Sequence, residues 1–178
     1  MKCGRFRVSK YMRTLKSYIV LFGIIAIFSL AASAQVLTSV DGTRVDLNAQ
    51  SGKVVVLALG ASWLPLSGKQ AEYTTALANK YKGKNVVIYF IATDSTGARS
   101  KNFATDDAIR KWAFTNKLSV PILRDSDGAA TLNRYGVDQV PSFVVLDKTG
   151  KRVGEPFGGI DPKYDVTIPI SKAIDKIL

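Results

Sequence analysis

Residues 54–67 read Val-Val-Val-Leu-Ala-Leu-Gly-Ala-Ser-Trp-Leu-Pro-Leu-Ser, an apolar run that passes directly into a loop around Trp63. Residues 54–59 lack the alternation of a half-exposed strand, so they predict a central strand buried on both faces. The residues after the loop predict a helix over 70–81, because large apolar side chains recur there at intervals of four. A buried strand followed by an amphipathic helix is typical of an α/β domain.

The start of this helix contains Ser67 and, three residues later, Gln70. This is the spacing of a capping box, in which the serine side chain and the glutamine side chain each bond the other residue's backbone N–H. We therefore predict that Ser67 is the N-cap of the helix. A serine hydroxyl without an adjacent base is a poor nucleophile, so a catalytic role for Ser67 is the weaker interpretation.

Strands and helices alternate along the rest of the chain. Residues 36–47 predict a β-hairpin around the Asp41-Gly42 turn. Further strands are predicted at 85–92, 120–123, 142–146 and near 152–154, and further helices at 106–116, 127–135 and 168–178. This order indicates one α/β domain over residues 35–178, with a central mixed β-sheet flanked by helices.

The first 34 residues predict a secretory signal peptide. Six basic residues precede the apolar run 18–30, which ends in the small residues Ala32-Ser33-Ala34. We expect cleavage after Ala34 and export to the periplasm or the medium, with Met12 as an alternative start. The apolar run is short for a bilayer span of about 20 residues. An uncleaved anchor is the alternative, and it would be the only contact with a membrane.

Composition excludes several kinds of chemistry from residues 35–178. They carry 19 Lys and Arg against 14 Asp and Glu, a net charge of +5 with no basic block, which does not indicate a nucleic-acid partner. The chain has no His, and its only Cys is Cys3. Without these residues there is no thiolate, disulfide, Cys/His metal site or His-assisted nucleophile. We expect neither a metal nor a cofactor, and we interpret residues 125–128 as a turn because the glutamate of a calcium loop is missing after them.

Two motifs on this framework resemble the thioredoxin superfamily, and more narrowly its exported TlpA- and ResA-like thiol-disulfide oxidoreductases. The first is Ala61-Ser62-Trp63 after the apolar strand, and the second is Gly136-Val137 followed by Val140-Pro141-Ser142-Phe143. The resemblance covers residues 36–178 and implies a thioredoxin-like fold with an N-terminal β-hairpin extension. It also implies that Pro141 follows a cis peptide bond beside the active-site loop, and that the main chain of Val140 pairs with an extended substrate peptide.

The same resemblance shows which reactive atoms are missing. In the family the tryptophan is followed by Cys-Pro-Pro-Cys, which maps onto Leu64, Pro65, Leu66 and Ser67. Disulfide exchange needs an attacking thiolate and a second thiol that resolves the mixed disulfide. Leucine and serine supply neither, so we expect a degenerate, redox-inactive site with no catalytic residue.

Binding is then the function left for this surface, with an extended peptide or an envelope protein as the partner. Leu64 and Leu66 either fill space around the helix start or form an exposed apolar patch, and Pro141 serves either peptide binding or only its turn. A thiol-disulfide or redoxin-type activity, as in the relatives, and a purely structural scaffold are the alternative functions. The candidate binding residues are Trp63, Leu64, Pro65, Leu66, Ser67, Val140 and Pro141.

Overall fold

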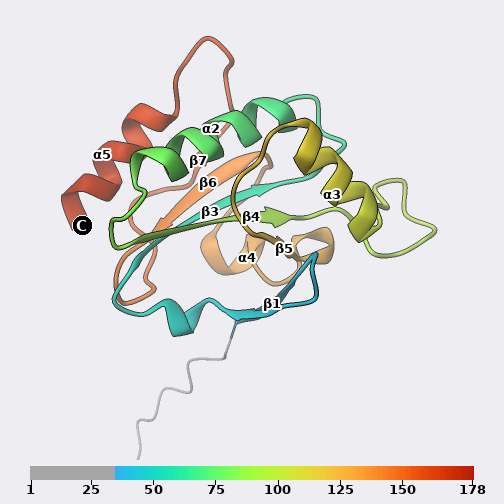
Figure 1. Ribbon diagram of the computed structural model, residues 1–178, viewed down its shortest axis with the longest axis horizontal. Helices are drawn as coiled ribbons and strands as arrows, with labels where there is room; N and C mark the ends of the chain where they lie inside the picture. Colours follow the sequence, from blue (N-terminus) through green and yellow to red (C-terminus); the bar gives the residue numbers. More distant parts are fainter. Residues whose placement is uncertain (1–34) are drawn as a thin grey trace, which may run out of the picture. The chain divides into compact units, whose positions relative to one another are not determined.

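The computed structural model describes residues 35–178, so the predicted signal peptide lies outside the described residues (Figure 1). None of the described helices is long and apolar enough to cross a membrane. In chain order the elements are β1 (Val36–Ser39), β2 (Arg44–Asp46), the 3-10 turn η1 (Asn48–Gln50), β3 (Val54–Gly60), α2 (Ser67–Lys80), β4 (Val86–Ala92), α3 (Asp106–Thr115), β5 (Ile122–Arg124), η2 (Ser126–Gly128), α4 (Leu132–Tyr135), β6 (Ser142–Leu146), β7 (Phe157–Gly158) and α5 (Thr167–Ile177).

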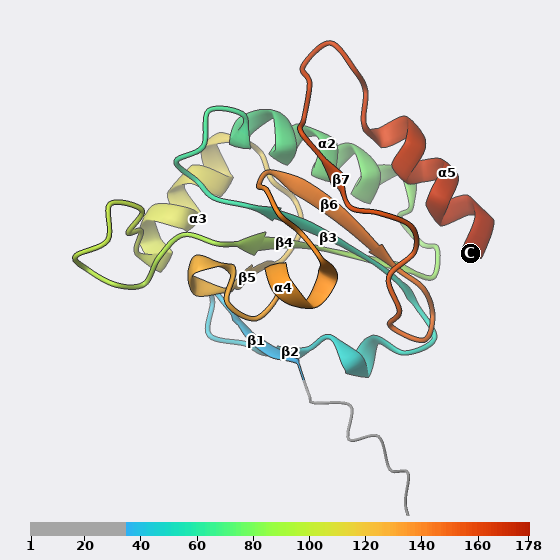
Figure 2. The same ribbon diagram turned by 180° about the vertical axis from the view of Figure 1, so that it is seen from behind.

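The strands form one mixed sheet in the order β2-β1-β5-β4-β3-β6-β7. Strands β3, β4 and β5 are parallel, whereas β6 pairs antiparallel with β3 and β7 antiparallel with β6. The β1–β2 hairpin is joined to the sheet by antiparallel pairing of β1 with β5. Helices α2, α3 and α5 cover one face and α4 covers the other, which Figure 2 shows from behind. The predicted α/β class, mixed sheet and N-terminal hairpin are confirmed.

Strand β3 explains the uninterrupted apolar sequence around which the sheet is built. All seven of its residues are buried, and successive side chains point to opposite faces. Val54, Val56 and Ala58 pack in the cluster under α2, α3 and α5, whereas the residues between them pack in the cluster under α4. A strand with a core on each side has no position for a polar residue.

Two predicted elements differ in kind from the structure, and they lie after β5 and after β6. The helix predicted over 127–135 is divided into η2 and α4, because Asp127 and Gly128 have positive φ angles of 57° and 68° that no α-helix accommodates. The strand predicted near 152–154 is a single bridge between Arg152 and Leu146, and ladder pairing resumes only at β7. Gly154 has a φ of 69°, which turns the chain away from the sheet.

Candidate functional site

The two motifs meet at one end of the sheet. Strand β3 ends at Gly60, and the loop of residues 61–66 leads from it into α2. Because β6 runs antiparallel to β3 with Ser142 opposite Leu59, the residues just before Ser142 lie at the same end. These residues are Val140 and Pro141, and the peptide bond between them is cis. The sheet therefore brings together the two segments that the sequence analysis singled out.

The loop residues differ in exposure. Trp63 is 52% exposed and Pro65 is also exposed, whereas Leu64 is half-buried. Leu66 is half-buried as well and packs against the core cluster under α2. The two leucines were expected either to fill space around the helix start or to form an exposed apolar patch. Leu66 fills space in the core, whereas the exposed apolar surface of the loop comes from Trp63 and Pro65.

The capping box predicted at Ser67 is wrong. Helix α2 begins at Ser67 itself with Leu66 as its N-cap, and no side chain caps it. The buried Ser67 Oγ donates to the carbonyl oxygen of Ser62 at 3.2 Å and accepts from Trp112 Nε1 at 3.3 Å. The hydroxyl therefore closes the 62–67 loop and links it to α3. A buried hydroxyl needs hydrogen-bond partners, and here the Ser62 carbonyl oxygen and the Trp112 indole N–H supply them in place of a backbone N–H of the helix.

Gln70, the other half of the predicted box, points into the core. Its side chain is fully buried, and Nε2 donates to the carbonyl oxygens of Leu59 and Ser142, each at 3.0 Å. The amide thus joins α2 to the ends of both β3 and β6. Gly60 leaves the space for it, since a Cβ there would lie 2.0 Å from Gln70 Oε1. The sequence signal was available, because Gln70 is a polar residue on the buried face of α2 together with Tyr73 and Leu77.

The loop is also fixed by hydrogen bonds to Asp94, a residue that the sequence analysis missed. Asp94 is fully buried two residues after β4, and both carboxylate oxygens accept from the Ser62 backbone N–H, at 3.1 and 3.0 Å. Ser62 Oγ donates to the same carboxylate at 2.5 Å. A buried carboxylate is costly unless it is hydrogen-bonded. We interpret this pair as a structural clamp, because the carboxylate is occupied by main chain as well as by the hydroxyl.

Lys69 carries the positive charge in the first turn of α2. Its hydrogen bond to Glu72, at 2.9 Å, raises the pKa of the Lys69 amine above its ordinary value. The amine therefore stays protonated at neutral pH and offers no general base. Among residues 35–178, no group of three or more His, Cys, Asp or Glu is placed to hold a metal ion.

Comparison with known proteins agrees with this architecture. A family profile described as Redoxin matches residues 28–163. The thiol-disulfide oxidoreductase ResA of Bacillus thuringiensis (strain Al Hakam) is 29% identical over 123 residues, which are 69% of this chain and 65% of the relative. The chain thus matches just under two thirds of the relative's length.

Solved structures show the same fold at lower identity. A thioredoxin-like protein from Aeropyrum pernix superposes with a TM-score of 0.64 at 18% identity, covering 93% of this chain and 98% of that one. A secreted Mycobacterium tuberculosis disulfide oxidoreductase homologous to E. coli DsbE has a TM-score of 0.60 at 22% identity, covering 79% and 94%. The described chain has the thioredoxin-like fold that these proteins share.

Proposed function

The chain belongs to the redoxin family, and on that premise we propose that it is a redox-inactive member that binds an extended peptide segment of an exported or envelope protein. The observation that carries the proposal is the difference in exposure between two neighbouring residues of the 61–66 loop. Leu64, which the family resemblance assigns to the position of the attacking thiol, is half-buried, whereas neighbouring Trp63 is 52% exposed. The reactive position is filled with hydrocarbon while a large aromatic surface stays accessible.

The proposed loss of redox chemistry is supported by the atoms at the two positions that the resemblance assigns to the thiols. The Leu64 side chain has no ionisable group, and the Ser67 hydroxyl is buried between Ser62 and Trp112. No cysteine occurs elsewhere in residues 35–178. A thiolate is required both for disulfide exchange and for a resolving step. The oxidoreductase function of the relatives therefore has no support from a residue of this domain.

Peptide binding is supported by the main chain beside the loop. Within residues 35–178, neither the backbone N–H nor the C=O of Val140 makes a hydrogen bond. An extended peptide could pair with these groups as an added strand, an interaction that needs no cysteine. Trp63 and Pro65 at the same end of the sheet would supply apolar contacts, and exposed tryptophans are frequent binding anchors.

Export is the cellular setting that we propose for this binding. It rests on the predicted signal peptide, and the similar M. tuberculosis protein is a secreted one. Mass spectrometry of the intact protein from the producing cells tests the proposal. The expected mass corresponds to a chain that begins at Gln35, and a mass that includes residues 1–34 would contradict cleavage.

An insulin-reduction assay tests redox inactivity. We expect the wild-type protein to reduce insulin no faster than dithiothreitol alone, and activity above this background would overturn the proposal. The variant Leu64→Cys/Ser67→Cys should gain activity, because a thiol at position 64 would lie beside the N-terminus of α2, whose dipole stabilises the attacking thiolate, and a thiol at position 67 would resolve the mixed disulfide. Leu64→Ala/Ser67→Ala is the matched control, since it removes the same Ser67 hydrogen bonds without adding thiols.

Binding of immobilised decapeptides tests the proposed surface. Trp63→Ala should weaken binding about tenfold or more, as expected for a central aromatic anchor. Phe114→Ala is the matched control, because Phe114 is an exposed aromatic residue on α3 at 87% exposure. N-methylation of alternate peptide nitrogens should also weaken binding if main-chain pairing occurs. Equal losses for the two aromatic variants would contradict the assignment.

A further inference from the structure

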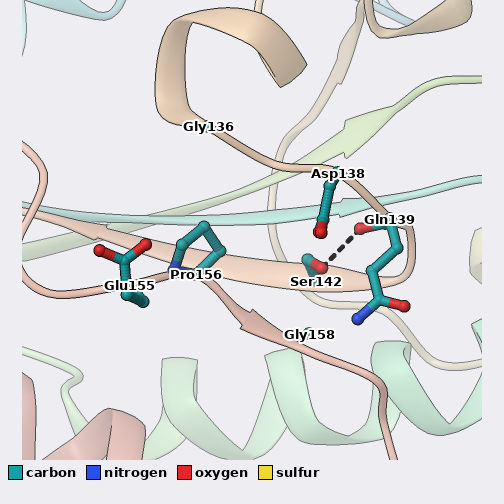
Figure 3. A pocket seen from close by; sticks show the side chains of 7 residues that line it. All are labelled: Gly136, Asp138, Gln139, Ser142, Glu155, Pro156 and Gly158. Carbon is teal, nitrogen blue, oxygen red and sulfur yellow. Dashed lines mark hydrogen bonds between the residues drawn. The ribbon is translucent and has the colours of Figure 1, made fainter.

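A cavity of about 370 Å³ opens beside the Val140–Pro141 segment (Figure 3). It lies between the loop that follows α4 and the segment that leads into β7, and its walls include Gln139, Ser142, Pro156 and Gly158. This volume is at the lower end of the range of small-ligand pockets, about 300–1,000 Å³. It is large enough for one long amino-acid side chain.

The cavity is continuous with the main chain proposed for peptide pairing. Gln139 and Ser142 both line it, and Val140 and Pro141 are the two residues between them. Within residues 35–178, the backbone N–H groups of Asp138, Gln139 and Val140 make no hydrogen bonds. Side chains of an extended peptide alternate between two sides. A peptide paired at Val140 would therefore present a side chain toward this cavity.

The charge of the cavity indicates what that side chain is. In Figure 3 the carboxylate of the exposed Asp138 points toward Ser142, and it makes no hydrogen bond or ion pair within the described chain. Glu155 lines the opposite side; its side chain is 85% exposed and lies 3.2 Å from Arg152 Nη2. Arg152 is also bonded through Nη1 to the Tyr135 carbonyl oxygen at 2.6 Å. The cavity therefore has two carboxylates, of which only Glu155 is paired with a cation, Arg152. This region is negative although the net charge of residues 35–178 is +5.

We propose that this cavity receives a lysine or arginine side chain of the bound peptide, an inference that rests on the proposed function. The methylene stem of such a side chain lies against Pro156 and its charged end reaches Asp138, while Glu155 adds negative charge from the opposite side. Long cationic side chains place their stems along apolar surface in this way and keep the charged end in polar surroundings.

A random decapeptide array probed with the purified protein tests this assignment. We expect lysine or arginine to be enriched in the bound sequences of the wild type. For the best basic peptide, Asp138→Asn should weaken binding about threefold and Asp138→Asn/Glu155→Gln about tenfold, with smaller effects in 0.5 M salt. Asp107→Asn is the control, because Asp107 is an exposed aspartate on α3 whose partner Arg110 bonds Val40 near the other sheet edge.

The outcomes separate the inference from the proposed function. Peptide binding that is sensitive to Trp63→Ala but shows no basic preference overturns the cavity assignment and leaves the proposed function standing. A basic preference that survives Asp138→Asn/Glu155→Gln also overturns the assignment. Absence of any peptide binding overturns both.

A second measurement examines the cavity without peptide pairing. Nα-acetyl-lysine methylamide, titrated into ¹⁵N-labelled protein, should shift the amide resonances of residues 136–139 and 155–158. Nα-acetyl-norleucine methylamide, which lacks the ammonium group, should shift them at least threefold less at the same concentration. Equal shifts with the two compounds would overturn the charge-based recognition.

Discussion

Asp94 and Asp125 are buried carboxylates that follow two adjacent parallel strands, β4 and β5, yet they organise different parts of the molecule. Asp125 accepts from the backbone N–H groups of Ala130 and Thr131 and from Thr131 Oγ1, five and six residues away. Asp94 accepts from the backbone and hydroxyl of Ser62, 32 residues away. One aspartate shapes a local turn, whereas the other pins the candidate binding loop to a neighbouring strand.

The partners of the two aspartates also differ in burial. Thr131 is completely buried, so its donors have no water to replace a lost acceptor. Ser62 is only half-buried, so part of its lost hydrogen bonding can be recovered from solvent. Removing an acceptor costs most where the remaining donor stays buried. The local turn should therefore contribute more to stability, and the long-range clamp more to function.

The largest expected effect is that of Asp125→Ala. The two donors of the fully buried Thr131 and the part-buried N–H of Ala130 lose their acceptor, so the free energy of unfolding should fall by about 3 kcal/mol. Urea denaturation followed by circular dichroism measures this change. Thr131→Val, which removes only the hydroxyl donor, should cost less than Asp125→Ala. A loss below about 1 kcal/mol for Asp125→Ala would show that solvent replaces the carboxylate.

Asp94→Ala should have a smaller effect on stability, about 2 kcal/mol, and a larger effect on the loop. Hydrogen exchange of the Ser62 amide should accelerate more than that of amides in β3, because this N–H loses its only acceptors in the described chain. Peptide binding should weaken as the loop that carries Trp63 loosens. Ser62→Ala keeps the backbone hydrogen bonds and is the milder control. Unchanged exchange in Asp94→Ala would contradict the clamp.

The smallest effect is expected at Asp147, where the same arrangement occurs at the surface. Its carboxylate accepts from the backbone and hydroxyl of Thr149 and from the backbone of Lys151. The Thr149 hydroxyl is the main cause that lowers the pKa of Asp147 below its ordinary value. Asp147→Asn should cost under about 1 kcal/mol, because solvent screens the charge and competes for the donors.

The pH dependence of this last difference has a definite sign. A carboxylate whose native pKa is lowered stabilises the fold above its unfolded pKa, about 3.9 for aspartate. The stability difference between wild type and Asp147→Asn should therefore be complete at neutral pH and decline as the pH falls below about 4. Denaturation curves at pH 7, 4 and 3 measure it. A difference that grows on acidification would contradict the assignment.

Caps and turns show how far local sequence can be trusted in this protein. Thr105 immediately precedes α3, the position where a threonine is a typical N-cap, and its side chain does accept from the Ala108 N–H. The Ser67–Gln70 pair had an equally suitable spacing, and that prediction was wrong. Because Thr105 is exposed, no packed neighbour competes for its hydroxyl, and the nearest partner is the backbone of its own helix. Gln70 is buried against the ends of β3 and β6, whose carbonyl groups take its amide.

The sequence by itself determined the order of strands and helices, the fold and the absence of a thiol or imidazole from residues 35–178. These properties depend on side-chain periodicity and on residue chemistry, which are local. Only the tertiary structure decided that Trp63 is exposed while Leu66 is packed, that Gln70 and Asp94 hold the loop, and that a cavity lies beside Val140. The hydrogen bonds of Asp94 and Gln70 join residues 32 and 72 positions apart in the chain. Exposure and cavities likewise depend on which distant segments pack together, so a local sequence pattern does not predict them.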